Sequence, residues 1–167
     1  MLKLAKHVGL VDKINEHVHL LKWHAPYHES DHVLAMAMNV LCNGTRLEHL
    51  ELLRNDSAFL DAVGADSIPD PTTAGDFCRR FSQQDIDALM TAINEVSSVP
   101  PEDIVFGCND RCDQENLIAQ LSGGVRSLCA PVDNLQSNWA YMLMTSVACK
   151  ANDSSLDELE RLHTGLG

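Results

Sequence analysis

DHVLAMAMNVLCNG, residues 31–44, is a segment with apolar side chains on most sides of a helix. A helix that is apolar all round is buried inside a globular protein. Ser30 is a favourable N-cap for a helix that starts at Asp31, and Asn43-Gly44 is a stop signal at its C-terminal end. The methionines of the segment are expected to fill core volume. The sequence therefore predicts a buried helix over these residues.

Amphipathic patterns on both sides of this segment predict further helices. Residues 4–21 carry a single apolar stripe whose positions are three or four residues apart. Residues 45–56 form a short amphipathic pattern with Thr45 as a candidate cap, and residues 56–65 form another that Gly64 closes.

Two more helices are predicted before residue 98. After two prolines that favour an extended chain, Thr73 is placed to cap a helix that brings Phe77 and Phe81 to one face. Residues 82–96 follow, with Ser82 as the cap and an apolar stripe formed by Ile86, Leu89, Met90 and Ile93.

The helical pattern stops at Pro100-Pro101, because proline cannot continue a helix. Residues 103–107, DIVFG, are the convincing strand candidate of the chain. A helix is then predicted from Asp113 to the glycines at 123–124, and residues 134–150 predict a last, strongly apolar helix. The chain is therefore predicted to be mainly α.

Composition limits the classes of function. The chain has 167 residues, 45% of them hydrophobic, and a formal charge of −12. Nucleic-acid binding draws its affinity from Lys and Arg, and Arg79-Arg80 is a local basic point without a broad basic face around it. No apolar run is long enough to cross a membrane, and the charged N-terminus is unlike a secretory signal, so a cytoplasmic location is expected.

Cysteines and histidines raise the question of a metal site. Cys108 and Cys112 are four residues apart, which permits a zinc site, although two reduced thiols on or near a helix are the better explanation. His28 and His32 would share one helical face, but Pro26 interrupts the segment. Solvated or hydrogen-bonded histidines are the simpler interpretation of this pair.

Two blocks of the sequence, residues 27–81 and 103–148, resemble the DDE domain group 1 class of bacterial insertion-sequence transposases. The strings that carry the resemblance are DPTTAGDFCRRF, residues 70–81, and NDRCDQENLIAQL, residues 109–121. The resemblance implies an N-terminal helical region, residues 1–98, that recognises DNA ends through Arg79 and Arg80. It implies a catalytic block of ribonuclease H-like fold over residues 99–149, with one short strand and two to three helices, and leaves residues 150–167 as an unrelated polar tail.

The resemblance also gives Glu115 a role. Enzymes of this class hold two Mg²⁺ ions with two aspartates and a glutamate, and the ions activate and stabilise the oxygens of phosphoryl transfer. Glu115 matches the glutamate, and Arg111, one helical turn earlier, is suited to a DNA phosphate or to orienting the carboxylate. From the residues alone, a solvated helix carboxylate paired with Arg111 is the simpler interpretation of Glu115.

The chain departs from the class where the two aspartates should be. In the class, a long stretch that contains most of the sheet and both aspartates separates the two blocks, whereas here residues 93–106 join them almost directly. The resemblance therefore implies a large internal deletion, with one metal-binding carboxylate left and no productive Mg²⁺ binding.

Three hypotheses about function follow. The first is a truncated, catalytically inactive transposase of a bacterial insertion sequence, located with the nucleoid when DNA is bound. The second is a non-catalytic helical protein that binds terminal inverted repeats, or that pairs with full-length transposase or with itself and inhibits transposition. The third is a small helical protein without a DNA role.

Overall fold

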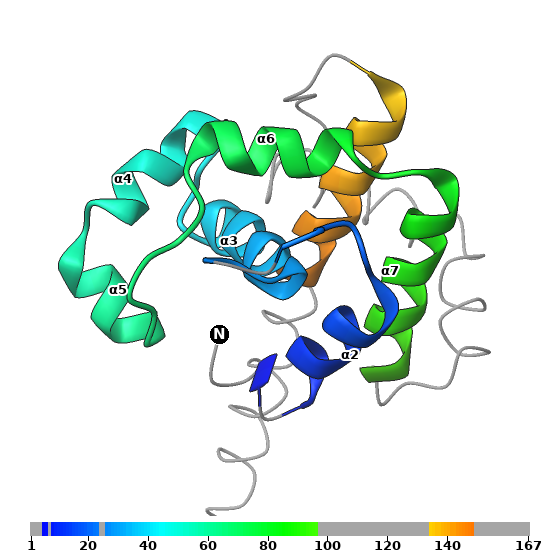
Figure 1. The fold of residues 1–167 in the computed structure, drawn as a ribbon. Coiled ribbons are helices and arrows are strands. Elements are labelled where there is room, and N and C mark those ends of the chain that lie inside the picture. Colours follow the sequence, from blue (N-terminus) through cyan, green and yellow to red (C-terminus); the bar gives the residue numbers. More distant parts are fainter. Residues whose placement is uncertain (1–4, 7, 24–25, 97–133, 149–167) are drawn as a thin grey trace, which may run out of the picture.

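A computed structural model of the protein describes residues 5–6, 8–23, 26–96 and 134–148. Helix α3 (Glu29–Leu41) lies at the centre, as its apolar sequence predicts, and its side chains from Val33 to Ala37 are at most 1% exposed. Met36 and Met38 are both buried in the core, which confirms their predicted role. The other helices surround α3 (Figure 1).

The ends of α3 differ in part from the prediction. The helix begins at Glu29 with His28 as its N-cap, because the Asp31 carboxylate accepts the His28 backbone N–H at 2.8 Å in a capping box. The predicted cap, Ser30, is wrong: it lies inside the first turn and is buried. The predicted stop is confirmed, because Asn43, two residues after Leu41, takes a left-handed conformation with φ 60°.

Helix α2 (Leu10–His17) is shorter than the stripe over residues 4–21 predicts. Gly9 has φ 76° and precedes the helix as its N-cap, so the apolar stripe is interrupted and Val8 is 45% exposed. The buried face begins at Leu10 and continues through Ile14. α2 packs against α7 (Gln83–Val96) and also against α3.

Helix α7 confirms the predicted helix over residues 82–96. Ser82 and Asp85 exchange hydrogen bonds at its start, as the predicted cap requires. Met90, which was assigned to the apolar stripe, is 40% exposed, and Ala92 is buried in the stripe. Glu95 joins α7 to α2 by an ion pair of 3.0 Å with Lys13.

The segment after α3 forms three short helices, namely a 3-10 helix η1 (Leu47–His49), α4 (Leu50–Arg54) and α5 (Ser57–Val63). Thr45 is not the cap that the sequence predicts, since η1 follows Arg46 and has no side-chain cap. α5 ends at Gly64 in the left-handed conformation, as predicted.

Helix α6 (Pro71–Arg79) crosses over α3 and leads into α7 (Figure 1). Its cap is Asp70, whose carboxylate accepts the backbone N–H groups of Thr72 and Thr73, so the prediction of Thr73 as the cap is wrong. Phe77 and Phe81 share one buried face, as predicted, and their rings meet edge to face at 5.3 Å.

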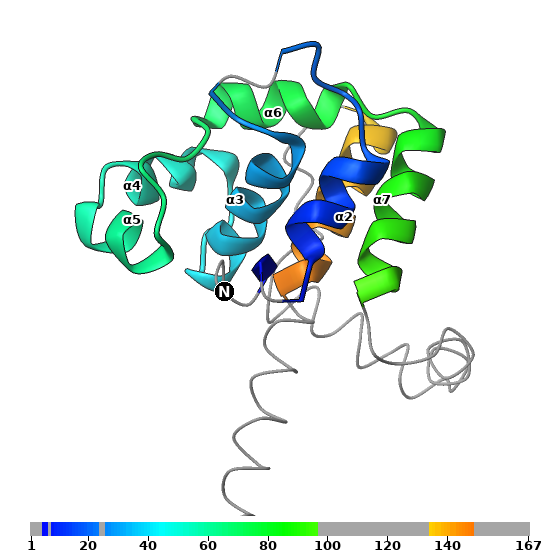
Figure 2. The same cartoon turned by 60° about the horizontal axis from the view of Figure 1, so that its bottom comes forward.

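The last described helix, residues 135–148, confirms the apolar helix predicted near the end of the chain. It lies between α3 and α7, behind α2 in Figure 2, and its buried side chains belong to the same core as those of α3. Tyr141 and Met144 are its largest fully buried side chains.

The fold is mainly helical, and every regular element in the described ranges is a helix. The predicted strand at 103–107 and the predicted helix from Asp113 lie outside these ranges. Among the described residues, no helix combines the length and the apolar character needed to cross a membrane.

Candidate functional site

The loop between α2 and α3 is held in place by a buried carboxylate. Glu29 is 1% exposed, and its Oε1 accepts the backbone N–H groups of Leu20 at 3.1 Å and Leu21 at 3.0 Å. Hydrogen bonds from N–H groups to a carboxylate are stronger than those between neutral groups. This anchor fixes the backbone immediately before Lys22 and Trp23, whose side chains are exposed.

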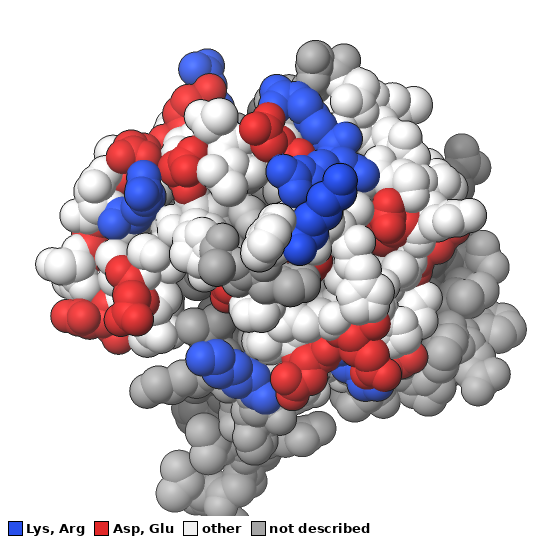
Figure 3. Space-filling model, in the orientation of Figure 1, with Lys and Arg blue, Asp and Glu red and all other residues white. Residues whose placement is uncertain are grey.

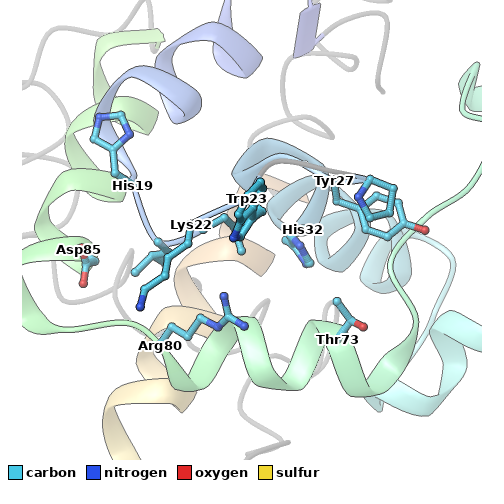
Figure 4. Close-up of a pocket in the computed structure, with 11 residues that line it drawn as sticks. His19, Lys22, Trp23, Tyr27, His32, Thr73, Arg80 and Asp85 are labelled. Carbon is cyan, nitrogen blue, oxygen red and sulfur yellow. The ribbon is translucent and has the colours of Figure 1, made fainter.

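Beside this loop lies a hollow of about 770 Å³. The loop forms one side, α3 contributes His32, and α6 and its C-terminal end contribute Thr73 and Arg80 (Figure 4). The full set of lining residues is His19, Leu20, Leu21, Lys22, Trp23, Pro26, Tyr27, His32, Thr73, Arg80 and Asp85. Ligand sites in proteins typically have volumes of this order.

His32 is the most buried polar side chain of the hollow. It is 2% exposed, its ring stacks on Phe77 at 4.3 Å, and Tyr27 meets it edge to face at 5.9 Å. Its Nδ1 atom is buried without a hydrogen-bond partner. Burial away from water lowers the pKa of His32 to about 4, so the ring is neutral at pH 7.

Two cations, Lys22 from the loop and Arg80 from the end of α6, line the hollow (Figure 4). Arg79 precedes Arg80 on α6, and we call these three residues the basic cluster. Figure 3 shows Lys and Arg side chains gathered over the C-terminal end of α6. Arg79 pairs with Asp76 at 2.9 Å, whereas Asp85 places one negative charge at the margin of the hollow.

Of the site residues predicted from the sequence, two lie in the described part of the chain and two lie outside it. Arg79 and Arg80 stand together in the basic cluster, with Arg79 47% exposed and Arg80 lining the hollow. Arg111 and Glu115 lie outside the described residues, as do Cys108 and Cys112.

Candidate metal ligands are not brought together in the described ranges. There, no group of three or more His, Cys, Asp or Glu side chains is arranged to hold a metal ion. His28 caps α3, whereas His32 is buried in the core rather than solvated, and its Nδ1 atom has no hydrogen-bond partner. Cys42 and Cys78 are free thiols, and burial raises the pKa of Cys78 to about 12.

Most residues of the hollow carry no signal in the sequence that predicts a site. Lys22 and Trp23 follow a predicted helix without any motif of their own, and the pattern around His32 indicates either a metal ligand or a solvated or hydrogen-bonded histidine. Arg80 is 58 residues from Lys22 along the chain. The Pro26 break was the signal that this segment forms a loop, but it does not reveal what the loop faces.

Compared with protein-family models, with curated proteins and with solved structures, the chain shows no match.

Proposed function

We propose that the protein is a shortened relative of bacterial insertion-sequence transposases that binds DNA and does not cut it. The observation that supports this most is the basic cluster, which combines the two arginines of the DPTTAGDFCRRF string with Lys22 from a distant segment. Cations that converge on one surface are what DNA phosphates bind. The ligand is double-stranded DNA, in the first place the terminal inverted repeats of the parent element.

The net charge of −12 sets the expected strength of this interaction. Ten acidic and four basic residues lie between Met36 and Ser98, so the cluster is a basic site on an otherwise acidic chain. Long-range repulsion then opposes DNA at low salt, and only a few phosphates are neutralised. We expect weak binding with a modest salt dependence, at the bacterial nucleoid within the cytoplasm.

The proposal excludes cleavage for a chemical reason. Two Mg²⁺ ions in phosphoryl transfer need several carboxylate ligands, and by resemblance this chain retains only Glu115, in the part assigned to the ribonuclease H-like remnant at 99–149. One carboxylate cannot hold both ions in place. Arg111, four residues before it in sequence, remains a candidate for a phosphate contact.

A gel-shift experiment tests the proposal. The full chain is mixed with duplex DNA that carries the inverted repeats flanking its gene, with and without Mg²⁺. We expect a retarded band that weakens with salt and with Arg80→Ala, and no nicked product. Arg54→Ala is the matched control, since Arg54 is also a partly exposed arginine near a helix end but lies away from the hollow.

Two results would contradict the proposal. The absence of a retarded band even at the lowest salt would leave a helical protein without a DNA role. Mg²⁺-dependent nicking that disappears in Glu115→Gln would show that the catalytic centre is complete after all.

A second function, inhibition of full-length transposase by pairing, is favoured by one observation. Leu135 is 83% exposed and Trp139 is 49% exposed on the helix at 135–148. Exposed large apolar side chains close together are a feature of protein-binding surfaces. Co-expression with the intact enzyme should lower transposition, and Leu135→Asp should restore it; an unchanged transposition frequency would remove this candidate.

A further inference from the structure

The hollow is much larger than a phosphate contact requires, and an exposed tryptophan stands beside its cations. We propose that it binds one nucleotide unit, with the phosphate at Lys22 and Arg80 and the base stacked on Trp23. The ligand is a nucleoside monophosphate or the equivalent unit of a single DNA strand. This inference deepens the proposed function, because Arg80 serves both, but it does not depend on the binding of duplex DNA.

The phosphate half of the site comes from two side chains that approach from different segments. Arg80 offers a planar group that binds two phosphate oxygens at once, and Lys22 offers a mobile point charge (Figure 4). The Asp85 carboxylate, which accepts the backbone N–H of Ser82 at 2.8 Å, repels an anion from the part of the hollow that it lines. The phosphate is therefore placed toward Arg80.

The base half of the site comes from Trp23. Its side chain is 86% exposed, which is unusual for the largest apolar residue, and it lies on a loop that Glu29 anchors two residues earlier. Aromatic side chains beside a cationic groove are the usual platform for unpaired bases, because every base has a face that stacks. A base on Trp23 would cover apolar surface that water now contacts.

His32 adds a polar atom that lacks a partner. A buried nitrogen without a hydrogen bond is costly, and it belongs to a side chain that lines the hollow, so a small turn of the ring toward a ligand would give this nitrogen a partner. A nucleotide has acceptors and donors on its sugar and base that can meet this nitrogen. Thr73 is already engaged, since its hydroxyl donates to Asp70 at 2.6 Å, and it can only accept.

Glu29 is a positioning residue in this account. It does not line the hollow, yet its two hydrogen bonds hold the backbone that presents Lys22 and Trp23. Glu29→Ala should loosen the loop, so that the fluorescence anisotropy of Trp23 falls while that of Trp139 stays unchanged. A purely structural role would lower thermal stability and leave the anisotropy at low temperature as it was.

Tryptophan fluorescence tests the nucleotide site directly. Trp139 is replaced by Phe in the full chain, so that Trp23 is the only tryptophan. The protein is titrated with deoxyadenosine monophosphate, with deoxyadenosine, with inorganic phosphate and with an oligothymidine strand. We expect saturable quenching by the monophosphate or by the strand, and weak or no quenching by the nucleoside.

Variants then locate the response. Lys22→Ala and Arg80→Ala should each raise the Kd by about tenfold, the loss expected for one charge-assisted hydrogen bond. Arg54→Ala should leave the Kd unchanged. His32→Phe keeps the aromatic stacking and removes both ring nitrogens, so it should weaken binding while the circular dichroism spectrum is preserved.

The outcomes are distinguishable. Quenching by the monophosphate assigns a free-nucleotide site, and quenching by the strand alone assigns a single-strand contact. An absence of saturable quenching by either would overturn the inference, as would quenching that is equal for nucleoside and nucleotide, or a Kd that is unchanged in Arg80→Ala. A duplex gel shift without quenching would refute the nucleotide site and leave the proposed DNA binding intact.

Discussion

At the scale of single residues, His32 shows how one buried polar group couples stability to pH. The ring is held between Phe77 and Tyr27, away from water. Burial is the main reason for its low pKa, and the charge of Arg80 lowers it further. The carboxylates of Asp31, Glu29 and Asp70 act in the opposite direction without reversing the shift.

His32 predicts a loss of stability in mild acid. Its pKa is about 4 in the folded protein and has the ordinary histidine value of 6.5 in the unfolded chain, so between these values the unfolded chain binds the proton more readily. Stability should therefore fall as pH decreases from 7 to 5, by about 2 kcal/mol from this residue. Urea unfolding at pH 7 and at pH 5 measures this loss of stability, and the His32→Phe variant is the comparison.

The His32→Phe variant should not show the part of the stability loss between pH 7 and pH 5 that comes from His32. Other titrating groups, such as Glu95, whose pKa is lowered by its hydrogen bond from Lys13, are common to both proteins and cancel in the difference. Equal losses of stability in the two proteins would show that His32 is not the group responsible.

Gly44 gives a second prediction at this scale. A Cβ atom there would lie 2.6 Å from the backbone oxygen of Asn39 and would overlap its side-chain amide. Gly44→Ala should lower the free energy of unfolding by about 1–3 kcal/mol, as expected for forced overpacking. Gly75→Ala in α6 is the control, because its new Cβ finds ordinary contacts at 3.5 Å.

The control variant, Gly75→Ala, should raise the free energy of unfolding, whereas Gly44→Ala should lower it. Alanine is a better helix former than glycine by roughly 0.5–1 kcal/mol. Thermal unfolding measures the stability of both variants. An equal loss of stability in Gly44→Ala and Gly75→Ala would contradict the role of the close contact at Gly44.

At the scale of elements, the start of α6 depends on one carboxylate. Asp70 Oδ1 accepts the N–H groups of Thr72 and Thr73, and its Oδ2 accepts the Thr73 hydroxyl. These hydrogen bonds hold the pKa of Asp70 below its usual value, the one from the Thr73 hydroxyl most of all. The cap therefore contributes fully at neutral pH and weakens as pH falls through the folded-state pKa.

Removing this cap should destabilise the protein measurably. Asp70→Ala is expected to cost about 1–2 kcal/mol, which is typical of a lost N-cap. Asp66→Ala, a change of the same kind at an exposed position outside the helix, should be within about 0.5 kcal/mol of the wild type. Urea unfolding at pH 7 checks both, and equal stability of the two variants would refute the role of Asp70.

The helices themselves were largely predictable, and their ends were not. Apolar periodicity identified α7, because burial of one face repeats along a helix, and strongly apolar segments identified α3 and the helix at 135–148. The predictions of Ser30 and Thr73 as N-caps are wrong, because the N-cap positions are occupied by the nearby residues His28 and Asp70. Several Ser, Thr and Asp residues near a helix start compete for it, and sequence alone does not rank them.

At the scale of the whole molecule, the helix at 135–148 completes the core. Tyr141 is 2% exposed and Trp139 is 49% exposed, so two aromatic residues on one helix meet opposite surroundings. Tyr141→Ala should lower the free energy of unfolding by about 3–5 kcal/mol. Trp139→Ala should cost clearly less, and a reversed order would show that this helix packs in another way.

Little of the candidate site could be predicted at this scale. The arginine pair stood out in the sequence, but the hollow joins segments that only the tertiary fold brings together. Charge shows the same limit, because a chain with a net charge of −12 still brings Lys22 and Arg80 to one hollow (Figure 4). Net charge determines long-range repulsion, whereas a local binding site depends on where the fold places individual Lys and Arg side chains.

The central claim is that the basic cluster contacts nucleic-acid phosphate. The most direct test is the salt dependence of binding to a fluorescein-labelled DNA duplex, measured by anisotropy for the wild type and for Arg80→Ala. Each lost phosphate contact should reduce the slope of log K against log salt by about one unit. The account predicts that reduction in the variant, and an unchanged slope or an absence of binding by the wild type would contradict it.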